Sequence, residues 1–298
     1  MARMWSKLIA VLVGIVAGLW WWQDFDEGVI RGKRVLVTGA STGIGEQLAY
    51  HYARMGASVM VTARRTQRLQ EVVTKCRELG RPDAIFGYVT GDMSNMSFTK
   101  ELINESIQRM GGLDYLLLNH ILSQDLHFWS GDVDDMAYLD KVFEVNFKAY
   151  VHLASHALPE LEKSNGHVVV LSSFAGKSAP PFSVPYASTK FALGGFFSGL
   201  RQELRMKDSS VSITTCTIGF IATDNAVASF ARIRNGAPLQ RIMGSAATPS
   251  DTALDIIRGA AYRQREVYTP FLQIYTTSFM NNLFPSLIDY IMRCIYSD

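Results

Sequence analysis

From Lys33 onward the sequence alternates between short runs rich in β-branched residues and longer segments with the apolar spacing of helices. The predicted strands are nearly continuous apolar runs, which is typical of strands covered on both faces. This alternation favours an α/β fold with a doubly wound parallel sheet. The predicted strands span residues 34–39, 58–64, 84–91, 113–120, 166–173, 211–219 and 266–270, and the predicted helices span 43–56, 66–80, 95–110, 134–162 and 186–206.

Composition excludes several classes of protein. Hydrophobic residues make up 48% of the 298 residues, enough for a sizeable core. The formal net charge is only +2 and no long Lys or Arg run occurs, so we expect no nucleic-acid partner. Three scattered cysteines, Cys76, Cys216 and Cys294, suit neither a disulfide framework nor a zinc site. His152 and His156 lie one helical turn apart without a third ligand, so we expect no metal.

The N-terminal segment differs from the rest of the chain. Residues 8–22 carry no charge and end in three tryptophans, with basic residues before them and acidic residues after them. Fifteen helical residues span about 22 Å, less than the roughly 30 Å of a bilayer core, so the segment is a signal anchor or a cleaved signal peptide. The charge asymmetry favours an anchor in the endoplasmic reticulum membrane with the catalytic domain in the lumen, and cleavage would instead lead to secretion.

We therefore predict three parts: an anchor or signal peptide over 1–30, a catalytic domain over 31–270 and an apolar helical segment over 271–298. The last segment is nearly free of charge. It is suited to packing on a partner subunit in a homodimer, to lying on a membrane surface, or to ordinary core packing.

The stretch TGASTGIG, residues 38–45, ends the first predicted strand and opens the first helix. A phosphate approaches a backbone most closely where side chains are absent, and a helix N-terminus adds partial positive charge. This placement predicts a dinucleotide-binding turn. Its candidate cofactor-binding residues are Gly39, Ser41, Gly43, Ile44 and Gly45.

The second predicted strand ends in TARR, where a carboxylate would be expected to hold the ribose hydroxyl of NAD. Arg64 and Arg65 favour a 2′-phosphate instead, so we predict NADP(H) as the cofactor. Asp92 follows the third strand, next to Met93. Its carboxylate is placed to accept a hydrogen bond from an adenine amino group, and capping the next helix is an equally good interpretation.

Four further residues form a candidate catalytic set. Tyr186 and Lys190 are four residues apart on a predicted helix, so the ammonium lies near the phenol and is expected to lower its pKa from about 10. Ser173 ends the fifth strand, and ligands collect at the carboxyl ends of such strands. Asn146 lies within a predicted helix, where an amide usually indicates a buried hydrogen bond.

Together, the motifs TGASTGIG, LLLNH, SSFAG and YASTK with Asn146 resemble the short-chain dehydrogenase/reductase family from Lys33 to about Pro270. The resemblance implies that Tyr186 is the general acid/base and that Lys190 lowers its pKa and holds the nicotinamide ribose. It implies that Ser173 polarises the carbonyl and that Asn146 holds a water. It also implies cofactor contacts at Asn119, His120, Ile121, Ile221 and Thr223.

Within that family, Asn119-His120, the N-terminal segment and the stretches AGK and TKFAL resemble the 11-beta-hydroxysteroid dehydrogenases. This implies alcohol–ketone interconversion on a steroid-like substrate. Pro180-Pro181 departs from the Tyr-Pro of the glucocorticoid-reducing members, which removes a possible polar contact to substrate. A retinoid or another lipid carbonyl is the alternative substrate, and an NADPH-binding sensor or scaffold without turnover is the alternative function.

Overall fold

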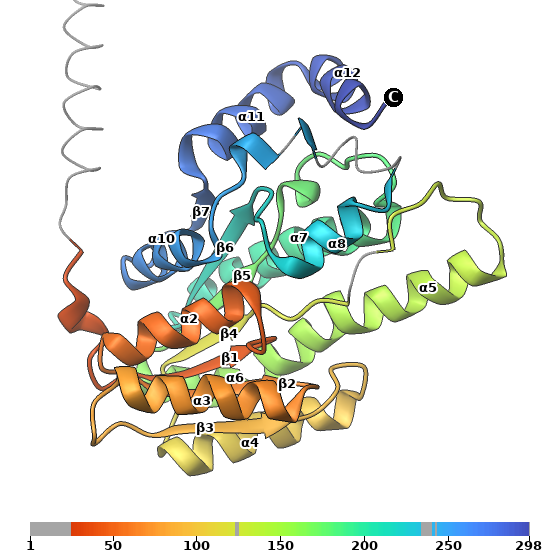
Figure 1. Cartoon of the computed structure of the whole chain (residues 1–298). Helices are drawn as coiled ribbons and strands as arrows, with labels where there is room; N and C mark the ends of the chain where they lie inside the picture. The colour runs from red at the N-terminus through yellow and green to blue at the C-terminus, as the bar shows by residue number, and fades with distance from the viewer. Residues whose placement is uncertain (1–24, 123–124, 234–239, 242, 298) are drawn as a thin grey trace, which may run out of the picture.

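A computed structural model describes residues 25–122, 125–233, 240–241 and 243–297 (Figure 1). Residues 1–24 of the predicted anchor or signal segment, which include its uncharged run, lie outside these described residues. Within the described ranges, no helix combines the length and the apolar character needed to cross a bilayer.

A seven-stranded sheet forms the centre of the molecule, and every neighbouring pair of strands is parallel. Its strand order is β3-β2-β1-β4-β5-β6-β7, which confirms the predicted doubly wound α/β fold. The strands are β1 (Arg34–Thr38), β2 (Ser58–Ala63), β3 (Phe86–Thr90), β4 (Tyr115–Leu118), β5 (His167–Leu171), β6 (Ser212–Ile218) and β7 (Glu266–Thr269).

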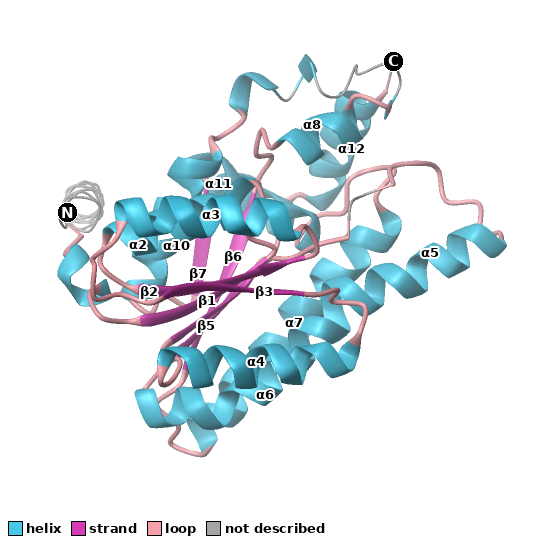
Figure 2. Ribbon diagram, turned by 60° about the horizontal axis from the view of Figure 1, so that its bottom comes forward, coloured by secondary structure: helices cyan, strands magenta, loops and turns pink. Residues whose placement is uncertain are grey.

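Helices cover both faces of the sheet (Figure 2). Successive side chains of a strand point to opposite faces, so Val35 and Val37 of β1 join one core while Leu36 joins the other. This arrangement explains why the strands are apolar at every position. One face carries α2 (Gly43–Arg54), α3 (Thr66–Leu79) and α10 (Pro249–Ala261), and the other carries α4 (Met96–Met110), α6 (Ala149–Ser164) and α7 (Val184–Met206).

The helix predicted over 134–162 is confirmed as one continuous helical stretch over 133–164, but it is not regular throughout. The structure has α5 (Val133–Phe143), a π-helical turn η2 (Glu144–Lys148) and then α6. Inside this turn the side chain of Asn146 accepts a hydrogen bond from the backbone N–H of Leu122, at 2.7 Å. A π-helical turn within an α-helix is often found at a functional site, and here it holds a predicted catalytic residue.

Two helices were not predicted, α8 (Asp224–Phe230) and α10. Both begin at a threonine N-cap: Thr223 accepts from the N–H of Ala226, and Thr248 accepts from that of Asp251. Such capping threonines are the local signal that identifies both helix starts. Other short helices in the part of the chain that the structure describes include η1 (Glu27–Ile30), η3 (Phe174–Gly176) and η5 (Met243–Ser245).

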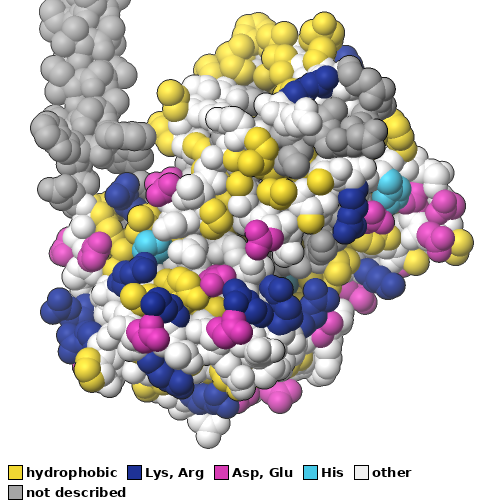
Figure 3. Space-filling model, viewed as in Figure 1, with side chains coloured by type: hydrophobic (Ala, Val, Ile, Leu, Met, Phe, Trp, Pro, Cys, Tyr) yellow, Lys and Arg dark blue, Asp and Glu magenta, His cyan; other side chains and the backbone are white. Residues whose placement is uncertain are grey.

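The C-terminal segment forms two helices, α11 (Phe271–Leu283) and α12 (Pro285–Tyr296), which lie beyond β7 in Figure 1. Apolar side chains gather on the outer surface of this part of the molecule (Figure 3). Inward-facing residues of the same helices, among them Ile274 and Ile288, are buried.

The order of the strands determines where a ligand can bind. Strand β1 lies between β2 and β4, so the connections that leave β1 and β4 run to opposite faces of the sheet. A crevice forms at such a switch point, beyond the carboxyl ends of the strands. The residues that follow β1, β4, β5 and β6 at this edge include Gly39, Asn119, Ser173 and Ile221.

Candidate active site

The glycine turn after β1 approaches neighbouring backbone too closely for side chains. Gly39 has φ +65°, and a Cβ there would lie 2.7 Å from the Cα of His120. A Cβ on Gly45 would lie 2.5 Å from the carbonyl oxygen of Gly39. Helix α2 begins at Gly43, and its N-cap residue Thr42 makes no side-chain capping bond. The first N–H groups of α2 therefore lack a side-chain cap, as is expected of a site for an anion.

A cavity of about 650 Å³ lies against this turn. Arg64 and Arg65 reach it from the end of β2, and the Nη2 of Arg65 donates to the hydroxyl of Ser41 at 3.0 Å. Gly45 packs beneath the turn and is outside the lining. The other predicted cofactor residues in the lining are Gly39, Gly43, Ile44, Asp92, Met93, Asn119, His120, Ile121 and Thr223.

Asp92 is not the cap of the helix that follows it. Its carboxylate accepts from the N–H of Ser94 at 2.9 Å, whereas the N-cap of α4 is Asn95, which accepts from the N–H of Ser97. Of the two interpretations of Asp92, the capping role is therefore wrong. Asp92 is exposed at the edge of the cavity, where its carboxylate can meet a ligand.

Asn119 and His120 join the end of β4 to the glycine turn. The amide of Asn119 donates to the carbonyl oxygens of Thr38 and Gly39, at 2.9 and 3.1 Å. The buried His120 ring lies between the hydroxyl of Thr38, at 2.9 Å, and the carbonyl of Val145, at 3.0 Å. Burial lowers the pKa of His120 to about 3, so the ring is neutral. A neutral ring must donate to the Val145 carbonyl and accept from Thr38.

A second cavity, of about 380 Å³, shares lining residues with the first. The shared residues are Ile44, Asn119, Ile121, Thr223, Ala226 and Phe230. Its lining is mostly apolar, apart from a small group of polar side chains that includes Ser173, Tyr186 and Lys190. An apolar cavity with a few convergent polar groups is the usual form of a small-molecule site.

Ser173 and Tyr186 enter this cavity from two different elements. Ser173 caps the short helix η3, and its hydroxyl oxygen accepts from the N–H of Ala175 at 3.1 Å. This bond uses a lone pair, so the hydroxyl proton is available for donation to a ligand. Tyr186 lies in the first turn of α7. Ile221 reaches the cavity from the end of β6.

Lys190 is buried, with 2% of its surface exposed. Its ammonium donates to the carbonyl of Leu171 at 2.9 Å and lies 5.5 Å from the ring centres of both Tyr150 and Tyr186. Burial lowers the pKa of Lys190 to about 7. A buried cation kept beside two tyrosine rings is a costly arrangement, of the kind found at catalytic sites.

Asn146 lines neither cavity. It is fully buried, and its Nδ2 has no hydrogen-bond partner among the described residues. Helix α7, which carries Tyr186 and Lys190, packs against the π-helical turn that carries Asn146. A buried donor of this kind suits a bound water better than direct contact with a substrate.

Some residues of the site were missed from sequence. The hydroxyl of Thr38, at the end of β1, is hydrogen-bonded to the backbone N–H of Asn119 and to the ring of His120. Its position at the start of TGASTGIG could have identified it as part of the site. Phe230 of α8 lines both cavities, and α12 closes the apolar cavity. No local motif marks these contacts, because they depend on how α8 and α12 pack around the cavity in three dimensions. The α12 residues in the lining are Ile291, Met292, Ile295 and Tyr296.

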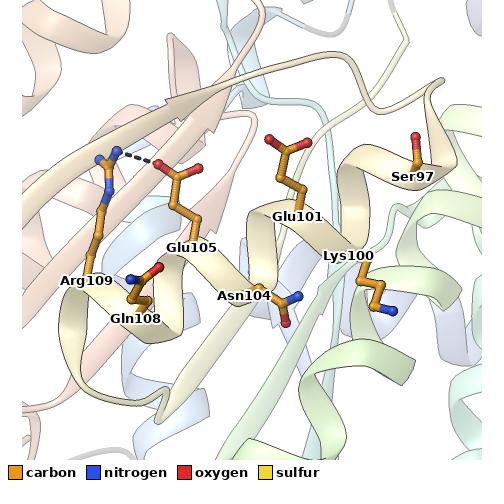
Figure 4. A pocket seen from close by; sticks show the side chains of 7 residues that line it. All are labelled: Ser97, Lys100, Glu101, Asn104, Glu105, Gln108 and Arg109. Carbon is orange, nitrogen blue, oxygen red and sulfur yellow. Dashed lines mark hydrogen bonds and ion pairs between the residues drawn. The ribbon is translucent and has the colours of Figure 1, made fainter.

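A further hollow lies elsewhere, on the outer surface of α4 (Figure 4). It measures about 890 Å³ and is lined by polar and charged side chains of that one helix, with an ion pair between Glu105 and Arg109. None of the predicted site residues lines it. A shallow polar surface of this kind lacks the apolar walls of a substrate site, so it is not a candidate for that site.

The packing of the glycine turn predicts a measurable effect. Gly45→Ala is expected to lower the free energy of unfolding by about 1–3 kcal/mol, because the new methyl group meets the Gly39 carbonyl and the Asn119 amide at 2.5 Å. Gly194→Ala on α7 is the control, since a Cβ there meets nothing within 4 Å, and it should stabilise by up to about 1 kcal/mol. Urea denaturation measures the free energy of unfolding of both variants. Equal changes would contradict the close packing of Gly45 against the Gly39 carbonyl.

A family model and several individual proteins match most of this chain. Residues 33–233 match the family model described as short chain dehydrogenase. The chain is 45% identical over 298 residues to the hydroxysteroid 11-beta-dehydrogenase 1-like protein of Danio rerio, covering 99% of each. It is 45% identical over 259 residues to the protein of the same name in Gallus gallus, covering 87% of this chain and 86% of that protein.

Two solved structures have a similar fold. One is a short chain dehydrogenase/reductase from Burkholderia phymatum in complex with NAD, with a TM-score of 0.73, 23% identity and coverage of 87% of this chain and 95% of that chain. The other is a short chain dehydrogenase from Burkholderia cenocepacia in complex with NADP, with a TM-score of 0.69, 24% identity and coverage of 80% and 96%.

Proposed function

The chain belongs to the short-chain dehydrogenase family, and from that premise we propose that it is an NADP(H)-dependent oxidoreductase that interconverts a secondary alcohol and a ketone on a steroid-like substrate. One observation carries the proposal. Ser173, Tyr186 and Lys190 line a mainly apolar cavity that shares residues with the cavity at the glycine turn. A dinucleotide and a bulky apolar ketone would thus meet beside a tyrosine.

The residues around the glycine turn fit a phosphorylated dinucleotide. The uncapped N-terminus of α2 would hold the pyrophosphate, and Arg64 and Arg65 would hold a 2′-phosphate. Asp92 would accept from an adenine amino group, and Met93, Asn119, His120 and Ile121 would line the path between the two cavities. When bound, the nicotinamide would supply or accept the hydride.

The chain's own residues would handle the proton. The Ser173 hydroxyl would donate a hydrogen bond to the substrate oxygen and so polarise the carbonyl, while keeping its proton. In reduction Tyr186 would protonate that oxygen, and in oxidation its phenolate would remove the proton from the alcohol. The Lys190 ammonium, 5.5 Å from the centre of the Tyr186 ring, would favour the phenolate. Asn146 would hold a water molecule through which protons pass between this site and solvent.

We also propose that residues 1–30 anchor the protein in the endoplasmic reticulum membrane, with the catalytic domain in the lumen. The support is the uncharged run over 8–22 and its flanking charges. Secretion after cleavage is the alternative. The homodimer stays a prediction.

A substrate panel tests the proposed function. Full-length protein is incubated with ketosteroids, retinals and simple lipid carbonyls, each with NADPH or NADH, and the corresponding alcohols are tested with NADP⁺ or NAD⁺. Steroid turnover with the phosphorylated cofactor is expected to dominate. Preferred turnover of retinals would move the substrate to the alternative class, and saturable NADPH binding without any turnover would replace the enzyme with a sensor or scaffold.

The cofactor preference is tested separately at Arg65. Arg65→Ala is expected to weaken NADPH binding by about tenfold or more while changing NADH binding less than threefold, because only NADPH loses a charge-assisted hydrogen bond. Arg68→Ala is the control, since Arg68 pairs with Glu46 and Glu71 outside the cavity. Fluorescence titration measures both dissociation constants, and an equal loss for the two cofactors would contradict the role of Arg65.

A further inference from the structure

The loop between η3 and α7 holds a bulky residue in an unusual backbone conformation. Phe182 has φ +65°, in the left-handed region that large side chains rarely adopt. The turn is closed by the hydroxyl of Ser183, which donates to the carbonyl of Pro180 at 2.7 Å. Such a conformation persists only when the surrounding contacts determine it, so the contacts of this ring are informative.

The Phe182 ring is buried between two other aromatic side chains. It lies 4.6 Å from the ring centre of Phe128, in the loop before α5, and 6.0 Å from that of Tyr296, on α12. These distances are typical of attractive aromatic pairs. Three segments that are far apart in the sequence therefore meet at this one ring.

Both partner segments are held in place independently. Asp135, which is buried, accepts from the backbone N–H groups of Ser130 and Gly131, at 2.6 and 2.9 Å, and so anchors the loop that carries Phe128. At the end of α12, Arg241 donates to the carbonyl oxygens of Cys294 and Ile295, at 2.7 and 2.8 Å. These bonds hold the backbones of the two segments, whereas the Phe182 ring packs against the side chains of Phe128 and Tyr296.

Tyr296 is the member of this group that forms part of the cavity wall. It lines the apolar cavity together with Phe230, whose ring centre is 6.2 Å away, whereas Phe182 and Phe128 are outside the lining. Phe182 contacts Tyr296 without lining the cavity itself, although Pro180 and Ser183 of the same loop do line it. The space available to a substrate on the α12 side depends on a residue that does not touch it.

We propose that Phe182 is a positioning residue that sets the width of the substrate cavity, by bracing Tyr296, and so selects apolar substrates by size. The proposal rests on the proposed function, because it assumes that this cavity takes the substrate. Removing the ring leaves space into which Tyr296 can withdraw. The widened cavity favours a bulky ketone and contacts a small one less well, and a difference of a few methylene groups is enough to change selectivity severalfold.

The test compares two ketones, a bicyclic ketone and a four-ring ketosteroid, in the full-length enzyme with NADPH. Phe182→Ala is expected to raise the ratio of kcat/KM for the larger ketone over the smaller by about tenfold, through KM, with kcat for the smaller ketone changed less than threefold. Phe182→Leu should shift the ratio in the same direction by less, and it provides the test where Phe182→Ala does not fold. Phe182→Met has a longer and more flexible side chain than leucine, which can reach Tyr296, so it should keep the ratio within threefold of the wild type.

Phe86→Leu is the matched control for Phe182→Leu. Both phenylalanines are 9% exposed, but Phe86 begins β3 and lines neither cavity. It should lower stability without changing the ratio. A folded Phe182 variant with an unchanged ratio, or with equal losses for both ketones, would overturn the proposal.

Measurements of ketone binding distinguish a failure of this proposal from a failure of the proposed function. Calorimetric dissociation constants of the same two ketones, measured without cofactor, should show the same change in ratio. Absence of turnover in the wild type would count against the proposed function alone, and an unchanged ratio of dissociation constants would then overturn the role of Phe182.

Discussion

Replacing Tyr186 with phenylalanine is expected to lower kcat by about three orders of magnitude, because it removes the group that would exchange a proton with the substrate oxygen. The ring and its place in the first turn of α7 are kept, so the apolar wall is preserved. NADPH affinity should change less than threefold. Steady-state kinetics on the best substrate of the panel and fluorescence titration of the cofactor measure the two quantities.

Tyr150→Phe is the matched control for Tyr186→Phe. The Tyr150 ring also lies 5.5 Å from the Lys190 ammonium, but its hydroxyl donates to the carbonyl of His120 inside the core. Loss of that bond should cost about 1 kcal/mol of stability and less than tenfold in kcat. Comparable losses of kcat in the two variants would show that the site needs tyrosine packing near Lys190 and would contradict proton transfer by Tyr186.

Replacing Lys190 with methionine is expected to reduce kcat at least a hundredfold while making the cofactor-free protein more stable, by about 1–4 kcal/mol near neutral pH. The reason is the burial of a cation whose only hydrogen-bond acceptor among the described residues is the Leu171 carbonyl. Methionine fills a similar volume without a charge to desolvate. Chemical denaturation of both proteins measures the difference.

The stability gain from Lys190→Met should depend on pH. Burial lowers the pKa of Lys190 from 10.5 to about 7 in the folded protein. Between these values the unfolded chain binds a proton that the folded protein does not, so the wild type gains stability as pH rises. The advantage of the variant should therefore be largest at or below about pH 7 and smaller at about pH 9.

Lys207→Met provides the control for this experiment. Lys207 is exposed just past the end of α7, so its replacement should change stability by less than about 0.5 kcal/mol at either pH. A Lys190→Met protein that is less stable than the wild type would show that the ammonium contributes more to the fold through the Tyr150 and Tyr186 rings than its burial costs.

Much of the site was predictable because its motifs follow strands at one edge of a parallel sheet. Gly39 follows β1, Asn119 follows β4 and Ser173 follows β5, and the carboxyl ends of parallel strands meet. The helical spacing of Tyr186 and Lys190 placed both on one face of α7, where the structure has them lining one cavity. Local pattern is sufficient for these residues. Each lies either just after a strand of the parallel sheet or at a fixed helical spacing on α7.

Local pattern did not predict where a helix departs from regular α-helical geometry. The expected helix and buried hydrogen bond of Asn146 are confirmed, since its side-chain carbonyl accepts from the Leu122 N–H, but the π-helical turn that holds it was not predicted. The partner is 24 residues away, so no window of local sequence contains it. The two roles weighed for Asp92 were likewise separated only by the observed cap of α4 at Asn95.

The sequence by itself determined the sheet, the dinucleotide turn and the catalytic candidates, since apolar periodicity, glycine spacing and helical spacing act over short distances along the chain. Only the tertiary structure decided the shape of the apolar cavity beside Tyr186. Its wall is completed by Phe230 and Tyr296, supported by Phe182, and these residues come together through packing between segments that are far apart in the sequence. Such packing depends on the shapes of side chains in three dimensions, which a one-dimensional pattern does not contain.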